Sequence, residues 1–157
     1  MKCRILYFTR TGNSRRIAEK LAIGIDCGTS RIVDDISWKG LLGWFRGGFH
    51  SLKGTKTKTM IEDGTELSDF DSIVLVVPLW AGNTAPAGYS FIEDYRKDIK
   101  NLFVVISNDG SEAANAFTKL EDRVGKINHK YSITKSVGNE DLVVAKVTED
   151  VLAEGEK

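Results

Sequence analysis

The segment Asp71–Val77 restricts the possible folds most strongly, because it is continuously apolar from Ile73 onward. A strand with apolar side chains on both faces needs cover on both faces, and this is typical of parallel sheets flanked by helices. A chain of 157 residues is long enough to bury such a sheet. We therefore predict an α/β protein with helices on both sides of a central sheet.

Strand-like and helix-like segments alternate along the rest of the chain. The pattern predicts strands at 3–8, 30–33, 71–77, 101–107 and 130–137, with 30–33 near an edge of the sheet. It predicts helices at 13–25, 87–97 and 111–125, and a short strand extension followed by a last helix within 139–153. Neither internal repeats nor a linker divide the chain, so we expect one domain over 1–157, a doubly wound sandwich with a five-stranded parallel sheet.

Composition excludes several classes of protein. Lys and Arg number 22 and Asp and Glu 22, which is unlike the basic excess of a nucleic-acid-binding protein. No apolar run approaches the ~18 residues of a membrane span, and we expect no signal peptide and a cytoplasmic location. Cys3 and Cys27 lack the spacing of a metal site or a disulfide framework. His50 and His129 are isolated, so we expect neither a metal site nor catalytic acid–base residues.

Ligands of doubly wound sheets bind at the carboxyl ends of the strands, and the loop after the first strand carries three hydroxyl side chains. Its residues are Thr9, Arg10, Thr11, Gly12, Asn13 and Ser14. A helix N-terminus with nearby hydroxyl groups can bind a phosphate, and Gly12 permits a tight turn. The alternative is that Thr11 or Asn13 only caps the helix. The loop lacks the lysine of a nucleoside-triphosphate P-loop.

Two further loops follow the predicted buried strands. The first contains Pro78, Leu79, Trp80, Ala81, Gly82 and Asn83. Trp80 offers a flat face for a planar ring, unless it is an ordinary buried tryptophan, and Gly82 permits close approach of the backbone. The second contains Ser107, Asn108, Asp109 and Gly110, whose composition is typical of a turn. Its alternative role is a plain turn that caps the next helix at Ser111.

The pattern Thr9-x-Thr11-Gly12-x-Ser14 after an apolar strand, joined to the Trp80 loop, resembles the flavodoxin family over essentially the whole chain. The resemblance implies a strand order of 2-1-3-4-5 and an FMN cofactor with its phosphate in the first loop. It places Trp80 beside the isoalloxazine ring, with Ala81, Gly82 and Asn83 at its redox-active edge, and residues 107–110 at its pyrimidine edge. Many flavodoxins carry a second stacking aromatic residue in the 107–110 loop, but this chain has none there. One face of the flavin is then open, or an aromatic residue from 37–59 covers it.

Residues 37–59 form an insertion in which apolar residues recur at helical spacing. They are Trp38, Leu41, Leu42, Phe45, Phe49 and Leu52. Lys39, Arg46 and Lys53 are seven residues apart and share one helix face, and 39–58 contains five basic and no acidic residues. We expect a short basic amphipathic helix that caps the sheet with a solvated basic face. The sharper hypothesis is that these cations dock an acidic redox partner or a nicotinamide phosphate.

The sequence therefore favours an FMN-binding electron carrier that shuttles electrons between redox partner proteins. The alternative is an NAD(P)H-dependent FMN oxidoreductase that reduces a quinone or another small acceptor, which the open flavin face and the basic insertion would suit. A phosphoacceptor signalling domain needs acidic residues after the first and third strands, where this chain has Phe8-Thr9 and Val77-Pro78. The intact first two loops argue against a module that has lost its flavin.

Overall fold

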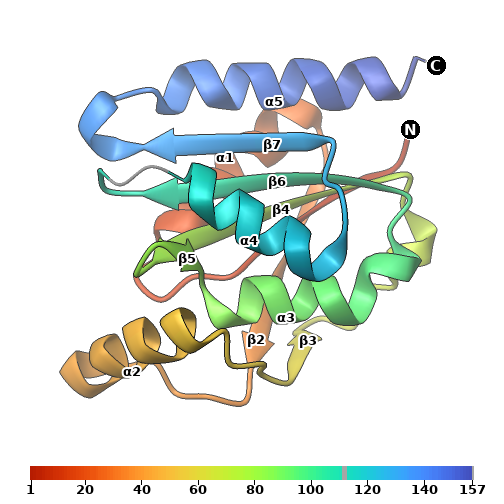
Figure 1. The fold of residues 1–157 in the computed structure, drawn as a ribbon. Helices are drawn as coiled ribbons and strands as arrows, with labels where there is room; N and C mark the ends of the chain where they lie inside the picture. The colour runs from red at the N-terminus through yellow and green to blue at the C-terminus, as the bar shows by residue number, and fades with distance from the viewer. Residues whose placement is uncertain (111–112, 157) are drawn as a thin grey trace.

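A computed structural model describes residues 1–110 and 113–156. The strands are β1 (Cys3–Tyr7), β2 (Gly28–Asp34), β3 (Thr59–Ile61), β4 (Ser72–Trp80), β5 (Asn83–Thr84), β6 (Asn101–Asn108) and β7 (His129–Thr134) (Figure 1). The α-helices are α1 (Asn13–Ile25), α2 (Gly40–Lys53), α3 (Pro86–Tyr95), α4 (Ala114–Val124) and α5 (Glu140–Glu154). In this part of the chain no helix is long and apolar enough to pass through a bilayer.

The parallel strands lie in the order β2-β1-β4-β6-β7, so the predicted order 2-1-3-4-5 is confirmed. The five predicted parallel strands are present, and two short antiparallel strands that the sequence did not predict extend the sheet to seven strands. β3 pairs with β2 through Ile32 and Ile61, so β3 and not β2 forms that edge. β5 pairs with the end of β4. Strands of two or three residues are too short to leave a period-2 pattern in the sequence.

Helices cover both faces of the sheet, as the apolar strand required (Figure 1). Side chains of β4 alternate between two cores: Val74 and Val76 pack with α1 and α5, whereas Leu75 and Val77 pack with α3 and α4. Val74, Leu75, Val76 and Val77 are fully buried. This two-sided packing fixes β4 in the middle of the sheet and brings the loop after it to the same edge as the loops after β1 and β6.

The segment between β7 and α5 differs from its prediction. The last strand ends at Thr134 rather than at 137, because a 3₁₀ turn, Lys135–Val137, follows it. The strand extension expected within 139–153 is wrong, since α5 begins at Glu140. The side chain of Asn139 closes this connection, because its Oδ1 accepts a hydrogen bond from Thr134 N at 2.8 Å and its Nδ2 donates one to Ser132 O at 3.1 Å. α4 begins at Ala114; Ser111, the expected start and cap of that helix, lies outside the described residues.

The helix predicted in the insertion exists as α2, but its expected packing is wrong. Its small residues Gly43, Gly47 and Ser51 face the protein and are buried. Its large apolar residues are exposed, with exposed fractions from 56% for Phe49 to 81% for Leu41 and Leu42. A Cβ on Gly43 would lie 2.2 Å from the backbone of Trp38. The helix therefore lies too close to its neighbours for a large side chain to fit on its inner face.

Candidate functional site

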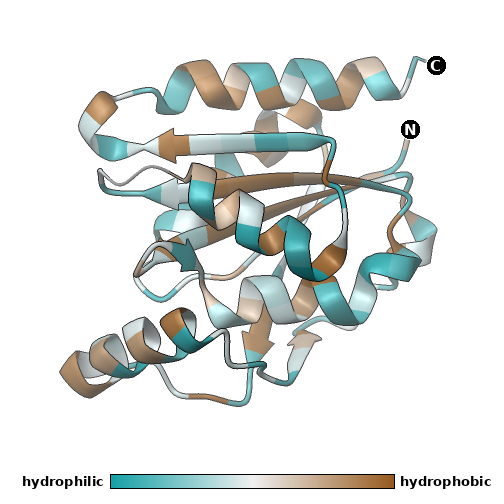
Figure 2. Cartoon of the chain, in the orientation of Figure 1, coloured by the Kyte–Doolittle hydropathy of each residue, from teal (hydrophilic) through white to brown (hydrophobic). Residues whose placement is uncertain are grey.

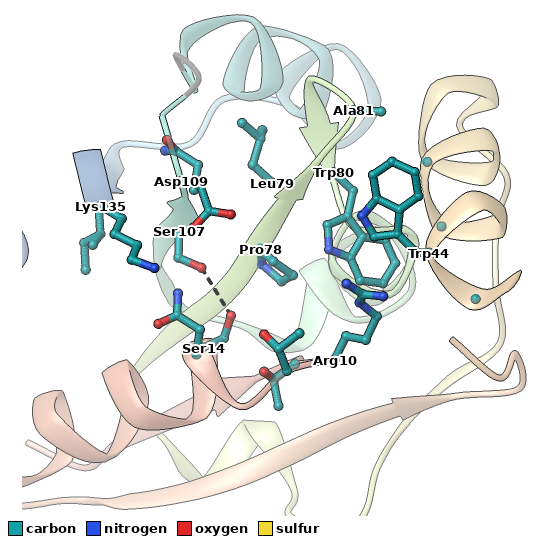
Figure 3. A pocket seen from close by; sticks show the side chains of 18 of the residues that line it. Arg10, Ser14, Trp44, Pro78, Leu79, Trp80, Ala81, Ser107, Asp109 and Lys135 are labelled. Atoms are coloured by element: carbon teal, nitrogen blue, oxygen red, sulfur yellow. Dashed lines mark hydrogen bonds between the residues drawn. The ribbon is translucent and has the colours of Figure 1, made fainter. Parts of the chain in front are cut away.

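A cavity of about 960 Å³ lies at the carboxyl ends of the parallel strands, where the three predicted loops meet. The first loop contributes Thr9, Arg10, Thr11, Asn13 and Ser14, the second Pro78, Leu79, Trp80 and Ala81, and the third Ser107, Asn108 and Asp109. Figure 3 shows Ser14, Ser107, Asp109 and Lys135 at one end of the cavity, and Arg10, Trp44 and Trp80 at the other. The cavity thus has a polar end and an aromatic end.

Four of the predicted residues, Gly12, Gly82, Asn83 and Gly110, are not among the described residues that line the cavity. Gly12 is the N-cap of α1 and has φ +92°, a left-handed conformation that glycine adopts without strain. Its backbone N donates a hydrogen bond to Thr9 Oγ1 at 2.9 Å, which closes the turn. Gly12 and Gly82 have positive φ and Asn83 donates a hydrogen bond to a backbone oxygen, so these three residues shape the loops around the cavity.

The N-terminus of α1 has no side-chain cap, so the alternative in which Thr11 or Asn13 caps the helix is not observed. Asn13 instead accepts a hydrogen bond from the Arg16 guanidinium at 3.0 Å. Ser14 is buried, and its Oγ lies 3.3 Å from Ser107 Oγ of the third loop. The first turn of α1 therefore presents free backbone N–H groups and hydroxyls to the cavity, which is the chemistry of an anion site.

The side chain of Trp80 is held in place by packing against other residues of the protein. Its ring meets Phe8 edge to face at 5.7 Å and Trp38 at 5.3 Å. A Cβ on Gly47 of α2 would lie 3.1 Å from the indole, and Ser51 Oγ donates a hydrogen bond to Trp80 O at 2.7 Å. The indole is thus fixed by packing before any ligand arrives, and its remaining surface lines the cavity.

The hairpin after Trp80 turns through Ala81 and Gly82, which have φ +48° and +75°. Two successive positive φ values are what a two-residue hairpin turn of type I′ requires. Asn83, which follows, donates from Nδ2 to Ser51 O at 2.8 Å. Asn83 therefore fastens the hairpin to α2 rather than entering the cavity.

The third loop contributes an amide with one unused acceptor. Asn108 Nδ2 donates to Ser132 Oγ at 3.1 Å and to Thr134 Oγ1 at 3.2 Å, so β7 holds the side chain. Asn108 Oδ1 is buried and has no hydrogen-bond partner among the residues that the structure describes. A buried acceptor without a donor costs free energy, and Asn108 lines the cavity.

The cavity also includes residues that the sequence did not single out one by one as ligand-binding, although it left open a contribution from an aromatic residue of 37–59. They are Arg16, Gly43, Trp44, Phe45, Gly47, Gly48, Phe49, Leu52, Ile133, Lys135 and Glu140. α2 supplies an aromatic wall, and Lys135 extends into the cavity directly after the last parallel strand (Figure 3). The sequence position of Lys135 could have indicated this role, because Lys135 follows a parallel strand and all parallel strands end at the edge where the cavity lies.

Glu140 at the start of α5 is paired with two cations of α1. The Arg16 guanidinium donates to both carboxylate oxygens, and Lys20 Nζ lies 3.2 Å from Oε1. The hydrogen bonds from Arg16, supported by Lys20, lower the pKa of Glu140 to about 2. This ion pair braces α1 against α5 beside the cavity, and the Glu140 carboxylate neutralises the charge of Arg16.

No protein-family model matches the chain, and no curated protein matches it. Solved structures do match over nearly their full lengths. One from Bacteroides eggerthii, provisionally named a flavoprotein, is 21% identical with a TM-score of 0.76, and the match covers 97% of this chain and 98% of that one.

Two other matches were solved with FMN. The flavoprotein of Lactobacillus acidophilus in complex with FMN is 15% identical with a TM-score of 0.68, covering 90% of this chain and 97% of that one. The flavodoxin of Fusobacterium nucleatum bound to flavin mononucleotide is 12% identical with a TM-score of 0.57, covering 98% of each. The chain has the flavodoxin-like fold, as the sequence predicted.

Proposed function

We propose that this chain binds FMN in the cavity and carries electrons between redox partners. The observation that carries the proposal is that one cavity joins the uncapped N-terminus of α1 to the fixed indole of Trp80. FMN has a phosphate, a polar pyrimidine edge and a flat apolar ring system, and the cavity offers a counterpart to each. The two structural neighbours that hold FMN support the choice of this cofactor.

The residues of the first loop would bind the phosphate. The backbone N–H groups of α1 and the hydroxyls of Thr9, Thr11 and Ser14 donate hydrogen bonds, and the positive end of the helix dipole favours the anion. Trp80 would flank the ring system, since packing already holds it in place. Asn108 Oδ1, which has no donor among the described residues, suits a ligand N–H group such as that of the pyrimidine edge.

Bound FMN would supply reversible electron transfer, so the protein itself needs to bind, orient and partly expose the cofactor. The α2 residues Trp44, Phe45 and Phe49 line the cavity beside the second loop and would limit the access of water to the ring. Leu79 and Ala81 add apolar surface at the second loop. The chain's own contribution is thus geometric and electrostatic.

FMN binding is tested by titrating the purified chain into FMN and following flavin fluorescence. We expect quenching that saturates with a dissociation constant of about 1 μM or below, corresponding to about −8 kcal/mol. A Leu79→Asp variant places a charge against the ring and should weaken binding strongly. Absence of quenching by the parent chain at a hundredfold higher concentration would contradict the proposal.

The second candidate is an NAD(P)H-dependent FMN oxidoreductase that reduces a quinone or another small acceptor. Two features favour it: the described part of the third loop has no aromatic side chain, and the cavity extends to the apolar wall of α2. That wall leaves room for an apolar reactant beside the flavin. Anaerobic mixing of the FMN-loaded protein with NADH or NADPH separates the candidates, because rapid bleaching of the flavin spectrum indicates the enzyme, and a stable spectrum indicates the carrier.

A further inference from the structure

The outward face of α2 is the most apolar exposed surface on a helix of the described chain. Six large side chains of this 14-residue helix are more than half exposed: Leu41, Leu42, Trp44, Phe45, Phe49 and Leu52. At 100° per residue five of them lie within an arc of about 100° opposite the buried Gly43, Gly47 and Ser51, and the sixth, Trp44, lies at the border of that buried face. Figure 2 shows α2 at the periphery of the molecule with its hydrophobic residues in brown.

One flank of this arc carries cations. Lys39, Arg46 and Lys53 are seven residues apart and exposed, and the Lys53 ammonium lies 4.5 Å from the ring centroid of Phe49. The whole stretch from 37 to 60 contains no Asp or Glu. The acidic residues of the neighbouring α3 are already paired, Glu93 with Arg123 and Asp94 with Lys56. The surface is therefore apolar with a basic border.

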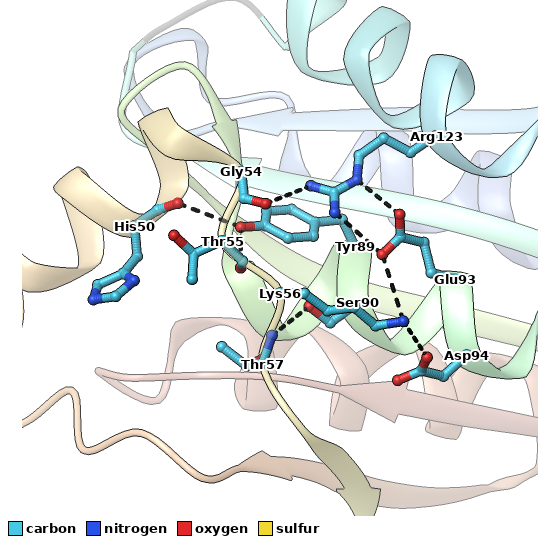
Figure 4. Close-up of polar contacts among 10 residues, drawn as sticks. All are labelled: His50, Gly54, Thr55, Lys56, Thr57, Tyr89, Ser90, Glu93, Asp94 and Arg123. Atoms are coloured by element: carbon cyan, nitrogen blue, oxygen red, sulfur yellow. Dashed lines mark hydrogen bonds and ion pairs between the residues drawn. The ribbon is translucent and has the colours of Figure 1, made fainter.

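The C-terminal end of α2 is tied to the body of the protein, so this exposure belongs to the folded chain (Figure 4). Tyr89 OH donates to Thr55 O at 2.6 Å, and Arg123 Nη1 donates to Gly54 O at 3.1 Å. Thr57 N donates to Ser90 Oγ at 3.0 Å. Together with the close contact at Gly47, these bonds prevent the helix from rotating its apolar arc inward.

The candidate FMN site does not account for this surface. Trp44, Phe45, Phe49 and Leu52 line the cavity, but Leu41 and Leu42 do not, and each is 81% exposed. Folded monomers rarely expose such a contiguous apolar patch, and one on a rigid surface is typical of a binding site.

We propose that the outward face of α2 docks on the surface of an anionic lipid bilayer, lying in the plane of the interface. A helix with Trp, Phe and Leu on one face and Lys and Arg beside them has the composition of an interfacial helix. The aromatic and leucine side chains would enter the boundary between headgroups and acyl chains, and the cations would contact lipid phosphates. The inner face needs no polar side chains, because Gly43, Gly47 and Ser51 pack on the protein.

Two other occupants fit less well. An acidic redox protein would complement the cations, but electron-transfer complexes bury small interfaces, so much of this apolar arc would stay uncovered in such a complex. A second copy that packed α2 against α2 would bring the same acid-free segment to both sides, so the cations would have no acidic complement.

The test is co-sedimentation of the full chain with vesicles of phosphatidylcholine alone or mixed with phosphatidylglycerol. We expect preferential binding to the anionic vesicles, weakened by salt, with a blue shift of tryptophan fluorescence that a Trp44→Phe variant reduces.

Leu41→Ser/Leu42→Ser lies outside the cavity and should weaken binding on the order of tenfold. Lys39→Gln/Arg46→Gln/Lys53→Gln should remove the preference for anionic lipid, whereas Ile23→Ser, an 84% exposed position on α1, is the matched control and should change nothing.

Three results would overturn the proposal. The first is no binding of the parent chain to anionic vesicles. The second is self-association in sedimentation velocity that Leu41→Ser/Leu42→Ser abolishes, which would assign the face to a second copy. The third is loss of vesicle binding when FMN saturates the protein, which would assign the face to the cavity. Since the vesicle assay needs no flavin, the proposal does not depend on the proposed function.

Discussion

The turn after Trp80 shows how one residue can hold a strained conformation beside the site. Ala81 has φ +48°, a left-handed conformation that costs a residue with a Cβ about 1–2 kcal/mol. Ala81→Gly removes that cost but raises the conformational entropy of the unfolded chain, which offsets part of the gain. We therefore expect the free energy of unfolding in urea to rise by about 0.5–1 kcal/mol. Gly82→Ala, at φ +75°, is the reciprocal change and should lower it by about 1 kcal/mol. If Ala81→Gly does not raise the free energy of unfolding, or if Gly82→Ala does not lower it, the turn is not constrained in this way.

Ser14 connects the predicted phosphate loop to the third loop through Ser107. Ser14→Ala removes a donor for the phosphate and leaves the Ser107 hydroxyl without this partner. We expect the FMN dissociation constant, measured by fluorescence titration, to rise about fivefold to tenfold, equivalent to about 1 kcal/mol. Thr118→Ala, an exposed hydroxyl on α4, is the control and should leave affinity unchanged. Equal affinities for parent and Ser14→Ala would place the phosphate elsewhere.

At this scale the sequence predicted the residues that follow the first, third and fourth parallel strands, since their neighbours along the chain indicate their role. It did not single out Lys135 or Glu140 as parts of the site. The partner of Glu140, Arg16, is 124 residues away, and no local pattern encodes such a pairing.

Among the elements, α2 depends on its small inner face. Gly43→Ala would place a Cβ 2.2 Å from the Trp38 backbone, so we expect a loss of about 1–3 kcal/mol in the free energy of unfolding. Gly48→Ala in the same helix meets open space and should raise stability by about 0.5–1 kcal/mol through helix propensity. Urea unfolding of both variants measures these two changes in the free energy of unfolding. Equal changes for Gly43→Ala and Gly48→Ala would contradict the close packing of the inner face of α2.

The error over α2 has a physical reason. Periodicity shows which residues share a helix face, but it does not show which face is buried. In 40–53 the apolar residues and the small residues both recur at helical spacing on opposite faces. The close approach of Gly47 to Trp80 decides between them, and that contact joins segments distant in sequence.

The brace between α1 and α5 should make stability depend on pH. The pKa of Glu140 is lowered from its ordinary value of 4.5 to about 2, so its ion pair stabilises the fold above pH 4.5 and is lost as pH falls through about 2. Since the pair is partly exposed, Glu140→Gln should cost at most about 1 kcal/mol at neutral pH. We expect this difference from the parent chain, measured by urea unfolding, to close between pH 4.5 and 2. A difference independent of pH would rule out the ionic brace.

For the whole molecule, the fold was largely predictable because a doubly wound sheet follows from a few general rules. Alternating segments, right-handed crossovers and the two-faced burial of β4 leave few arrangements. The edge strand β3 and the hairpin strand β5 escaped prediction because they owe their pairing to β2 and β4 rather than to their own composition. The location of the site followed from the sheet, and an aromatic contribution from 37–59 was one of two alternatives, but the sequence did not show which residues of α2 line the cavity.

The central claim is that the first loop and the N-terminus of α1 bind the phosphate of FMN. The most direct test compares FMN with riboflavin, which has the same ring system without the phosphate, by fluorescence titration of the purified chain. If two charge-assisted hydrogen bonds are lost, we expect riboflavin to bind about 100-fold more weakly, equivalent to about 3 kcal/mol. Equal affinities for the two flavins, or binding of neither, would contradict the claim.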